Sequence, residues 1–309
     1  MTLDVVIPSY NRAKLLTQTL DSLLAAHRPE QLALKVFVVD NNSKDNTRNV
    51  VSAYQAKQAL AIEYVFQPVQ GRSAALNAGI QAGTGQLVAM LDDDEQVAVD
   101  WFHVLARMFE DSDLDFIGGP YLPHWTTDKP DWIGREFGGV VGWVENGEAE
   151  QQYGPGFNGM LMGGNAVVKR LALETAGPYN TSLGRTDKGL LSCEDEDMFH
   201  RLLTNNFRGM YVPDLVIYHY VSRERMTRQY HRRWCWGRGT SMGMLARTRT
   251  PEVVELFYIP HWRMRHAAAG LLGAIRGGLR LESPAIAFEG ELRFWDLAGY
   301  INGRFFRKM

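Results

Sequence analysis

Residues 87–95 read Leu-Val-Ala-Met-Leu-Asp-Asp-Asp-Glu, so five apolar side chains are followed directly by four acids. A continuous apolar run of this length is typical of a strand that is buried on both faces of a parallel sheet. Since side chains two apart on a strand point the same way, Asp92 and Asp94 can face one site. Neighbouring carboxylates repel unless a cation lies between them, so the stretch predicts a site for a divalent cation, Mn²⁺ or Mg²⁺. The alternative is a solvated acidic turn.

Further apolar runs lie on either side of this stretch, at residues 5–7, 36–39, 62–66 and 116–117. Between the first two runs, leucines recur at helical spacing over residues 15–24, which completes one strand–helix–strand unit. Repetition of this unit predicts an α/β fold with a mostly parallel, doubly wound sheet. Ligands of such sheets bind beyond the carboxyl ends of the strands.

A short segment that contains polar residues follows each of the first three predicted strands. These segments begin at Pro8, Asp40 and Gly71. Gly71 is the first glycine of the chain, so no glycine-rich phosphate loop follows the first strand, which argues against a dinucleotide-binding Rossmann site or a P-loop. The carboxylate of Asp40 can accept a hydrogen bond from a base or a ribose, and Arg72 at a helix start would favour a diphosphate. Ordinary turns and a solvated arginine are the alternatives.

A second acidic run, Glu194-Asp195-Glu196-Asp197, opens a predicted helix. Acids suit the first turn of a helix, and Asp197 can pair with Arg201 one turn later. Those roles use one or two of the acids, so the remaining carboxylates are available as a general base. His219, after the predicted strand 215–218, could supply a nitrogen to the same metal or be structural.

Composition and charge narrow the class of protein. The chain has 309 residues, of which 45% are hydrophobic, and two cysteines, too few for a disulfide scaffold. Residues 223–309 hold 16 Lys+Arg against 7 Asp+Glu, whereas residues 1–222 hold 17 against 28. The basic segment would suit peripheral contact with a membrane, packing on the acidic body or a homo-oligomer contact. With no signal peptide or spanning segment expected, we predict a cytoplasmic protein, peripheral at the inner face of the plasma membrane.

Six short motifs occur in one order along the chain, and together they resemble those of bacterial family-2 glycosyltransferases with the GT-A fold. They are Pro8-Ser9-Tyr10-Asn11-Arg12, Asp40-Asn41-Asn42-Ser43, Gly71-Arg72, Asp92-x-Asp94, Gly163-Gly164-Asn165 and Glu194-Asp195. The resemblance covers roughly residues 3–221. It implies a GT-A catalytic domain over residues 1–221, in which residues 1–119 bind the nucleotide sugar and 120–221 the acceptor. Residues 222–309 are expected to form a basic, mostly helical extension.

The resemblance also implies a role for each matched residue. The nucleoside-diphosphate sugar would be bound by Pro8, Ser9, Tyr10, Asn11, Arg12, Asp40, Asn42, Arg72, Asn77, Asp92, Asp93, Gly164 and Asn165. The metal would be held by Asp94 as the principal ligand, with Asp92 and His219. Asp195 would be the general base, with Glu194 beside it. Glu95 stands where many members carry a further aspartate, which would alter the outer edge of the site.

The reaction implied by the resemblance is a single displacement at the anomeric carbon of a hexosyl donor, which inverts its configuration. We expect a UDP-sugar as the donor, with GDP and dTDP sugars as alternatives. The acceptor would be a glycan or a lipid-linked glycan in cell envelope polysaccharide or glycolipid assembly, and no nucleic acid is expected as a partner. Two alternatives stay open: a non-catalytic scaffold that binds nucleotide sugars, and a sugar nucleotidylyltransferase, against which the missing early glycines count.

Overall fold

The computed structural model describes residues 1–110, 112–186, 189–248, 255–278 and 284–307. The chain forms two compact units, each built from several segments. The first unit comprises Met1–His124, Val144–Thr181 and Glu194–Tyr220. The second comprises Trp125–Trp143, Ser182–Cys193 and Val221–Met309. The two acidic runs and His219 all belong to the first unit.

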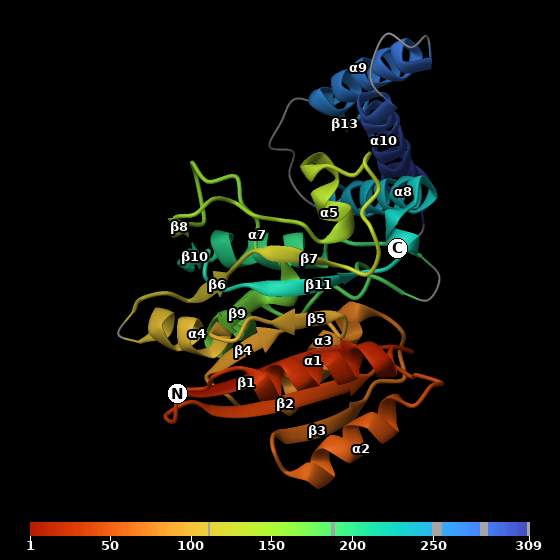
Figure 1. Ribbon diagram of the computed structural model, residues 1–309. Helices are drawn as coiled ribbons and strands as arrows, with labels where there is room; N and C mark the ends of the chain where they lie inside the picture. Colours follow the sequence, from red (N-terminus) through yellow and green to blue (C-terminus); the bar gives the residue numbers. More distant parts are fainter. Residues whose placement is uncertain (111, 187–188, 249–254, 279–283, 308–309) are drawn as a thin grey trace. The chain divides into compact units, whose positions relative to one another are not determined.

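The first unit is organised around an eight-stranded sheet (Figure 1). Its strands, in spatial order, are β3 (Ala61–Phe66), β2 (Ala33–Asp40), β1 (Thr2–Ser9), β4 (Leu87–Met90), β9 (Ala166–Lys169), β6 (Phe116–Gly118), β10 (Gly209–Tyr211) and β8 (Gln151–Gln152). Strands β3, β2, β1 and β4 run parallel, whereas β9 is antiparallel to both β4 and β6. The register of β1 on β2 ends at Ser9 opposite Asp40, so these two strands end at the same edge of the sheet.

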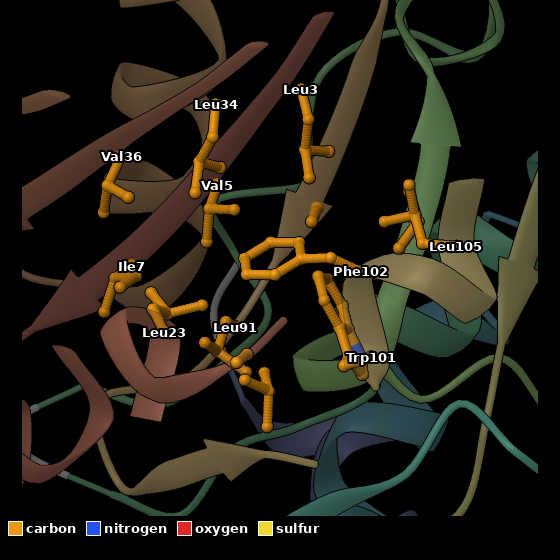
Figure 2. Packing of buried hydrophobic residues seen from close by; sticks show 14 of the residues in the cluster. Leu3, Val5, Ile7, Leu23, Leu34, Val36, Leu91, Trp101, Phe102 and Leu105 are labelled. Carbon is orange, nitrogen blue, oxygen red and sulfur yellow. The ribbon is translucent and has the colours of Figure 1, made fainter. Parts of the chain in front are cut away.

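Helices cover both faces of this sheet. They are α1 (Ala13–Ala25), α2 (Thr47–Lys57), α3 (Arg72–Ala82), α4 (Trp101–Phe109), α6 (Arg170–Ala176) and α7 (Glu194–Thr204). Figure 2 shows one face, where Val5 and Ile7 of β1 pack in one cluster with Leu23 of α1 and Phe102 of α4. Val6, between them, points to the opposite face and packs with Leu76 of α3. The alternation explains why the strands are apolar throughout, since both faces are buried. Burial of each such side chain contributes about 1.5–3 kcal/mol.

A smaller sheet of three strands follows the carboxyl end of β4, and all but the last residues of two of its strands belong to the first unit. It consists of β5 (Glu95–Val97), β11 (Ile217–Val221) and β7 (Tyr121–Trp125), in the order β5, β11, β7. β5 begins at the last acid of the run after β4, and it pairs antiparallel with β11 so that Glu95 lies opposite His219. Two residues distant in sequence are thereby brought together.

The second unit is mostly helical, as expected for the C-terminal residues. Its elements are η1 (Arg135–Phe137), α5 (Gly138–Val141), η3 (Glu224–Met226), α8 (Arg228–Leu245), β12 (Glu255–Leu256), β13 (Ile259–Pro260), α9 (His261–Gly278), α10 (Pro284–Ile301) and the π-helical turn η4 (Asn302–Phe306). Residues 125–143, which the sequence places with the acceptor-binding half, join the C-terminal helices in this unit. The centroid of the Trp132 ring lies 4.9 Å from that of His231 and 5.3 Å from that of Phe288, so this half-buried tryptophan packs against the core of the second unit.

Glycines allow the C-terminal helices to approach closely. At Gly270 of α9 and Gly290 of α10, an added Cβ would collide with the backbone of the other helix. The same holds for Gly239 of α8 against Asp296 of α10. None of the helices in the described ranges has the length and apolarity that crossing a membrane requires.

Candidate active site

The acidic run after β4 forms a turn that gathers three carboxylates. Asp92, Asp94 and Glu95 each contribute one oxygen, and these oxygens lie within 4.8 Å of one another. The sequence predicted that Asp92 and Asp94 would meet by alternation along a strand. They do meet, but β4 ends at Met90 and a turn brings them together. The amide of Asp92 donates to Glu95 Oε2 at 2.8 Å, and the carbonyl of Asp94 accepts the amide of Tyr220 at 2.8 Å, which fixes this turn.

Glu95 is the most deeply buried of the three acids, with no exposed surface. Its Oε1 atom is buried and has no hydrogen-bond partner in the described part of the chain. Burial raises the pKa of Glu95 well above its ordinary value, and the nearby charges of Asp92 and Asp94 raise it further. An orphaned carboxylate oxygen in an all-oxygen cluster fits a hard divalent cation such as Mn²⁺ or Mg²⁺. Asp92, Asp94 and Glu95 are therefore the residues that would hold it.

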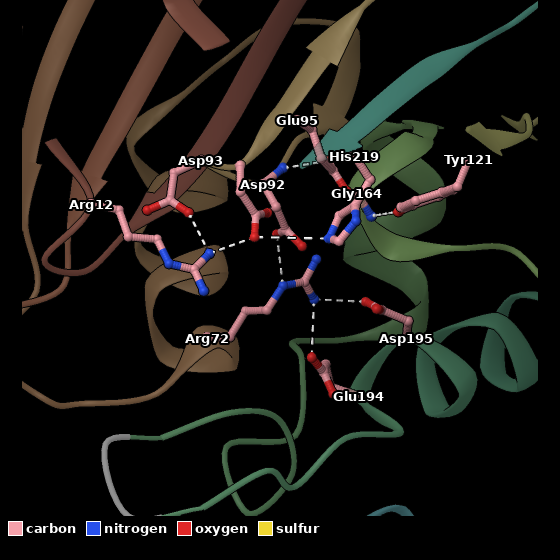
Figure 3. A network of polar contacts seen from close by, with 11 residues as sticks. Arg12, Arg72, Asp92, Asp93, Glu95, Tyr121, Gly164, Glu194, Asp195 and His219 are labelled. Atoms are coloured by element: carbon pink, nitrogen blue, oxygen red, sulfur yellow. Dashed lines mark hydrogen bonds and ion pairs between the residues drawn. The ribbon is translucent and has the colours of Figure 1, made fainter. Parts of the chain in front are cut away.

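His219 lies at the edge of this cluster. It is 4% exposed, and its Nε2 atom is 3.8 Å from Asp94 Oδ2 (Figure 3). The structure thus brings His219 beside the principal acid that the sequence assigned to the metal. Among the described residues, the group of closely spaced ligand atoms includes Glu95 and not His219.

Arg12 supplies one of two positive charges in the acidic turn. Its Nη1 atom lies 2.7 Å from Asp94 Oδ2 and 3.1 Å from Asp93 Oδ1. The hydroxyl of Ser9, at the end of β1, donates to the other oxygen of Asp93 at 2.8 Å. Burial raises the pKa of Asp93 to about 6, against the lowering effect of Arg12. The negative charge of Asp94, followed by that of Asp93, raises the pKa of Arg12, so this guanidinium stays charged.

Arg72, the first residue of α3, supplies the second charge and joins the two acidic runs (Figure 3). Its Nε atom donates to Asp92 Oδ1 at 2.8 Å. Its Nη1 atom donates to Asp195 Oδ1 at 2.9 Å and to Glu194 Oε1 at 3.1 Å, at the start of α7. The Nη2 atom is buried with no hydrogen-bond partner among the described residues. A guanidinium with donors to spare, between two acidic runs, is suited to bind an anionic group such as a diphosphate.

Asp195 and Glu95 both require glycine beside them. An added Cβ at Gly163 would collide with the Asp195 carboxylate, and one at Gly164 would collide with that of Glu95. The short turn η2 (Gly163–Asn165) therefore accommodates both acids. Burial raises the pKa of Asp195 above its ordinary value, although Arg72 opposes the shift. A carboxylate with a raised pKa at the edge of a charged site has the properties of a general base.

The loops after β1 and β2 hold each other in place at the end of the sheet. Asp40 is buried and accepts hydrogen bonds from the amide of Ser43 at 2.8 Å and from the hydroxyl of Tyr64 at 2.7 Å. Asn11 and Asn42 both adopt left-handed backbone angles, with φ of 53° and 67°. The Asn11 side chain accepts the amide of Lys44 at 2.6 Å. Of the residues in these two loops that the sequence assigns to the nucleoside, Pro8 is buried, whereas Tyr10 is 37% exposed and open to a ligand.

Two asparagines assigned to the nucleotide sugar have their side chains engaged within the protein. Asn77 exchanges two hydrogen bonds with the backbone of Tyr179, at 2.9 and 2.8 Å. Asn165 accepts from the indole of Trp101 at 3.0 Å and donates to the carbonyl of Leu215 at 2.6 Å. Both amides therefore serve as anchoring contacts within the protein.

Sequence reasoning missed two residues of the site. Glu95 extends the acidic run, so the signal for a third carboxylate was present but was assigned to the outer edge. Tyr121, whose hydroxyl accepts the amide of Gly164 at 2.5 Å, had no signal, because it comes from another strand. In the second acidic run, the predicted pair of Asp197 with Arg201 is confirmed at 3.0 Å, which separates Asp197 from the site.

Comparison with known proteins gives a family and a fold. The family model described as "Glycosyl transferase family 2" matches residues 4–177. The chain is 29% identical over 199 residues to the succinoglycan biosynthesis protein ExoM of Rhizobium meliloti, covering 64% of this chain and 60% of that protein. It is 30% identical over 189 residues to the glucosyl-dolichyl phosphate glucuronosyltransferase of Haloferax volcanii, covering 60% and 58%. The matches thus span less than two thirds of these relatives.

Solved structures resemble the chain over nearly its whole length. The mannosyltransferase PcManGT from Pyrobaculum calidifontis, in complex with GDP-Man and Mn²⁺, matches with a TM-score of 0.65 and 20% identity, over 99% of this chain and 88% of that one. TarS 1–349 of S. aureus, in complex with UDP, matches with a TM-score of 0.56 and 16% identity, over 98% and 90%. The predicted GT-A fold is confirmed by these neighbours.

Proposed function

Since the chain belongs to glycosyl transferase family 2, we propose that it is an inverting glycosyltransferase that moves a hexosyl group from a nucleoside-diphosphate sugar to an acceptor hydroxyl. The observation that carries this proposal is the position of Arg72, which contacts both the Asp92–Asp94–Glu95 cluster and Asp195. A diphosphate bound at that point would lie between a cation site and a candidate base. Such an arrangement serves the departure of the diphosphate and the activation of an acceptor in one step.

The roles of this chain's residues follow from their contacts. The exposed face of Tyr10 and the buried carboxylate of Asp40 flank the end of the sheet, where a nucleoside would be held. Arg72, with its unused Nη2 donors, would bind the diphosphate and stabilise the charge that develops on it. A divalent cation bound by Asp92, Asp94 and Glu95 would add positive charge against that developing charge.

Asp195 would take the proton from the acceptor hydroxyl. The acceptor oxygen then forms a bond to the anomeric carbon as the bond from that carbon to the diphosphate breaks, so the nucleoside diphosphate leaves and the configuration inverts. Asp195 needs to be free of Arg72 for this step, since an ion-paired carboxylate is a weaker base. Movement of Arg72 towards the donor diphosphate would supply that release.

We infer the acceptor class from the relatives. One of them is named for the biosynthesis of succinoglycan, and another for the transfer of glucuronate to a glucosyl-dolichyl phosphate. A glycan or a lipid-linked glycan in polysaccharide or glycolipid assembly is the acceptor that these names favour. UDP is the nucleotide we propose for the donor, and one structural neighbour holds UDP. GDP and dTDP are the alternatives, since another neighbour holds GDP-mannose.

Peripheral contact with an anionic membrane is a second part of the proposal, and it concerns the second unit. Helix α9 exposes Leu271, Leu272 and Ile275 at 53%, 60% and 53%, and α10 exposes Phe294 at 48%. Apolar side chains beside a basic segment suit the boundary of a bilayer with anionic lipid head groups. A homo-oligomer contact through the same side chains is the competing account.

A screen of nucleoside diphosphates tests the donor proposal without knowledge of the acceptor. We expect a nucleoside diphosphate to raise the melting temperature of the full chain in the presence of Mn²⁺ and much less in the presence of a chelator. Stabilisation by none of UDP, GDP and dTDP would contradict it. Consumption of a nucleoside triphosphate with a sugar phosphate would favour a nucleotidylyltransferase, and tight nucleotide binding without turnover over many acceptors would favour a scaffold.

A further inference from the structure

A cavity of about 410 Å³ lies within the second unit, and the proposed transfer reaction does not use it. One face of α8 forms its floor, because Arg232, Arg233, Trp236 and Thr240 recur at helical spacing. Trp295 of α10 and Leu190 close it from two other segments. The volume is at the lower end of those of small-molecule sites, which suits a ligand of the size of one or two sugar rings.

Two tryptophans give this cavity an apolar surface. The rings of Trp236 and Trp295 have centroids 6.2 Å apart with an angle of 67° between their planes, so one indole presents its face where the other presents its edge. Trp236 is 38% exposed, although an indole of its size is usually buried. A partly exposed indole in a cavity offers an apolar surface that can cover the C–H face of a sugar ring.

Three arginines make the cavity positively charged, and no carboxylate lines it among the described residues. Arg232 forms a bidentate ion pair with Glu291, in which its Nε and Nη2 atoms lie 2.5 and 3.0 Å from the two carboxylate oxygens. The indole N–H of Trp295 donates to the same carboxylate at 3.0 Å. Glu291 therefore fixes an arginine and a tryptophan in position and offsets the charge of only one arginine.

The charges of the other two arginines are available to a ligand. Arg233 contacts Glu224 at 3.5 Å, and both side chains are more than half exposed, so this is a weak surface pair. Arg307 forms no ion pair with a carboxylate in the ranges that the structure describes. Guanidinium groups at the wall of a cavity bind phosphates and carboxylates by paired hydrogen bonds.

We propose that this cavity, the Arg–Trp pocket, binds a saccharide that carries a phosphate or carboxylate group, with the sugar ring on Trp236 and the anionic group at Arg233 and Arg307. The inference rests on the proposed function only in that the saccharide would be part of the acceptor. The chemistry that decides the ligand is the combination of an indole surface with the guanidinium groups of Arg233, which has only a weak surface pair, and Arg307. A neutral sugar would leave the arginines unused, and a bare anion would leave the tryptophans unused.

Binding to the full chain tests this proposal, by calorimetry with glucose 1-phosphate, glucuronate, glucose and inorganic phosphate as probes. UDP and Mn²⁺ are present throughout, to fill the proposed donor site. We expect glucose 1-phosphate or glucuronate to bind at least about tenfold more tightly than glucose and phosphate, and the better of the two identifies the anionic group. Arg233→Gln and Trp236→Ala should each weaken that binding at least about tenfold. Arg293→Gln removes an exposed arginine of α10 outside the pocket, paired with Glu289 at 2.6 Å, and should leave binding unchanged.

Several results would overturn the proposal. The proposal is wrong if neither glucose 1-phosphate nor glucuronate binds, or if their binding is unchanged in both Arg233→Gln and Trp236→Ala. It is also wrong if inorganic phosphate binds as tightly as glucose 1-phosphate. Arg233→Gln alters an exposed side chain, so it remains decisive if Trp236→Ala does not fold. Anionic vesicles that bind through the same two residues while the sugars do not would assign the pocket to lipid head groups and equally refute it. Titration of UDP with Mn²⁺ in the same variants keeps the two proposals apart, because failure of the pocket leaves that binding intact and failure of the donor site leaves sugar binding intact.

Discussion

The guanidinium of Arg72 lies 2.9 Å from the carboxylate of Asp195, and the same side chain donates to Asp92 at 2.8 Å. One residue therefore connects the cation cluster with the candidate base. Without a donor, this contact neutralises Asp195 and reduces its strength as a base. The arrangement predicts that binding of the donor diphosphate precedes activation of the acceptor.

Replacement of Arg72 tests this connection. Arg72→Lys keeps the charge but loses the planar guanidinium, whose separate nitrogens contact Asp92 and Asp195 at the same time. We therefore expect donor affinity to fall about tenfold or more and the transfer rate to fall further. Arg107→Lys is the matched control, since Arg107 is an exposed arginine of the same unit that pairs with Glu150 at 3.2 Å. Equal donor affinity and transfer in both variants would show that Arg72 does not bind the diphosphate.

Asp195→Asn should abolish transfer and preserve donor binding. The amide keeps the shape of the side chain but cannot accept a proton, and loss of a positioned base costs about 10²–10⁴ in rate. Transfer and donor affinity should be measured for Asp195→Asn beside Glu194→Gln, Glu196→Gln and Asp197→Asn. Asp197→Asn serves as the control, because this acid pairs with Arg201. If a neighbouring amide variant loses transfer while Asp195→Asn retains it, the base has been assigned to the wrong position.

The affinity for Mn²⁺ should depend on pH through Glu95. Burial raises the pKa of this carboxyl, and a protonated carboxyl is a poor metal ligand. Affinity should therefore rise with pH as the proton leaves, and Glu95→Gln should lower affinity and flatten the dependence. Titration of Mn²⁺ between about pH 5 and about pH 8 measures this. A steep pH dependence that persists in Glu95→Gln would place the titrating group elsewhere, with Asp93 as the next candidate because its pKa is raised to about 6.

The membrane proposal predicts a specific effect on α9. The full chain should co-sediment with phosphatidylglycerol vesicles at low salt and less at moderate salt, because cations near an anionic surface contribute about 1 kcal/mol each. The double change Leu271→Asp and Leu272→Asp should weaken binding. Leu171→Asp, which changes a 70% exposed leucine of α6, is the control. Equal lack of binding to phosphatidylglycerol and phosphatidylcholine vesicles would refute membrane contact, and loss of a dimer in the α9 variant would favour the oligomer.

The sequence predicts the sheet and the meeting of Asp92 with Asp94 well, because both depend on local patterns, but it placed the two acids on a strand, whereas they lie in a turn after Met90. The apolar run ending at Leu91 and the acids that follow are visible without knowledge of the fold. The hydrogen bonds of the Asn77 and Asn165 side chains could not be predicted from the sequence, since their partners lie on segments that only the tertiary fold brings near. The same reason hid Tyr121, and it hid the grouping of residues 125–143 with the C-terminal helices. Glu95 was visible as an acid, but its burial under Gly164 was not.

Whether a cation at the acidic cluster holds the donor is tested by a calorimetric titration of UDP into the wild type and into Asp94→Asn, each with Mn²⁺ and with a chelator. Asp94 supplies one of the three closely spaced oxygens, so the variant should hold the cation less well and leave the diphosphate charge poorly neutralised. We expect tight binding only for the wild type with Mn²⁺, and a loss of at least about tenfold in the other three conditions. Equal UDP affinity in all four conditions would contradict it.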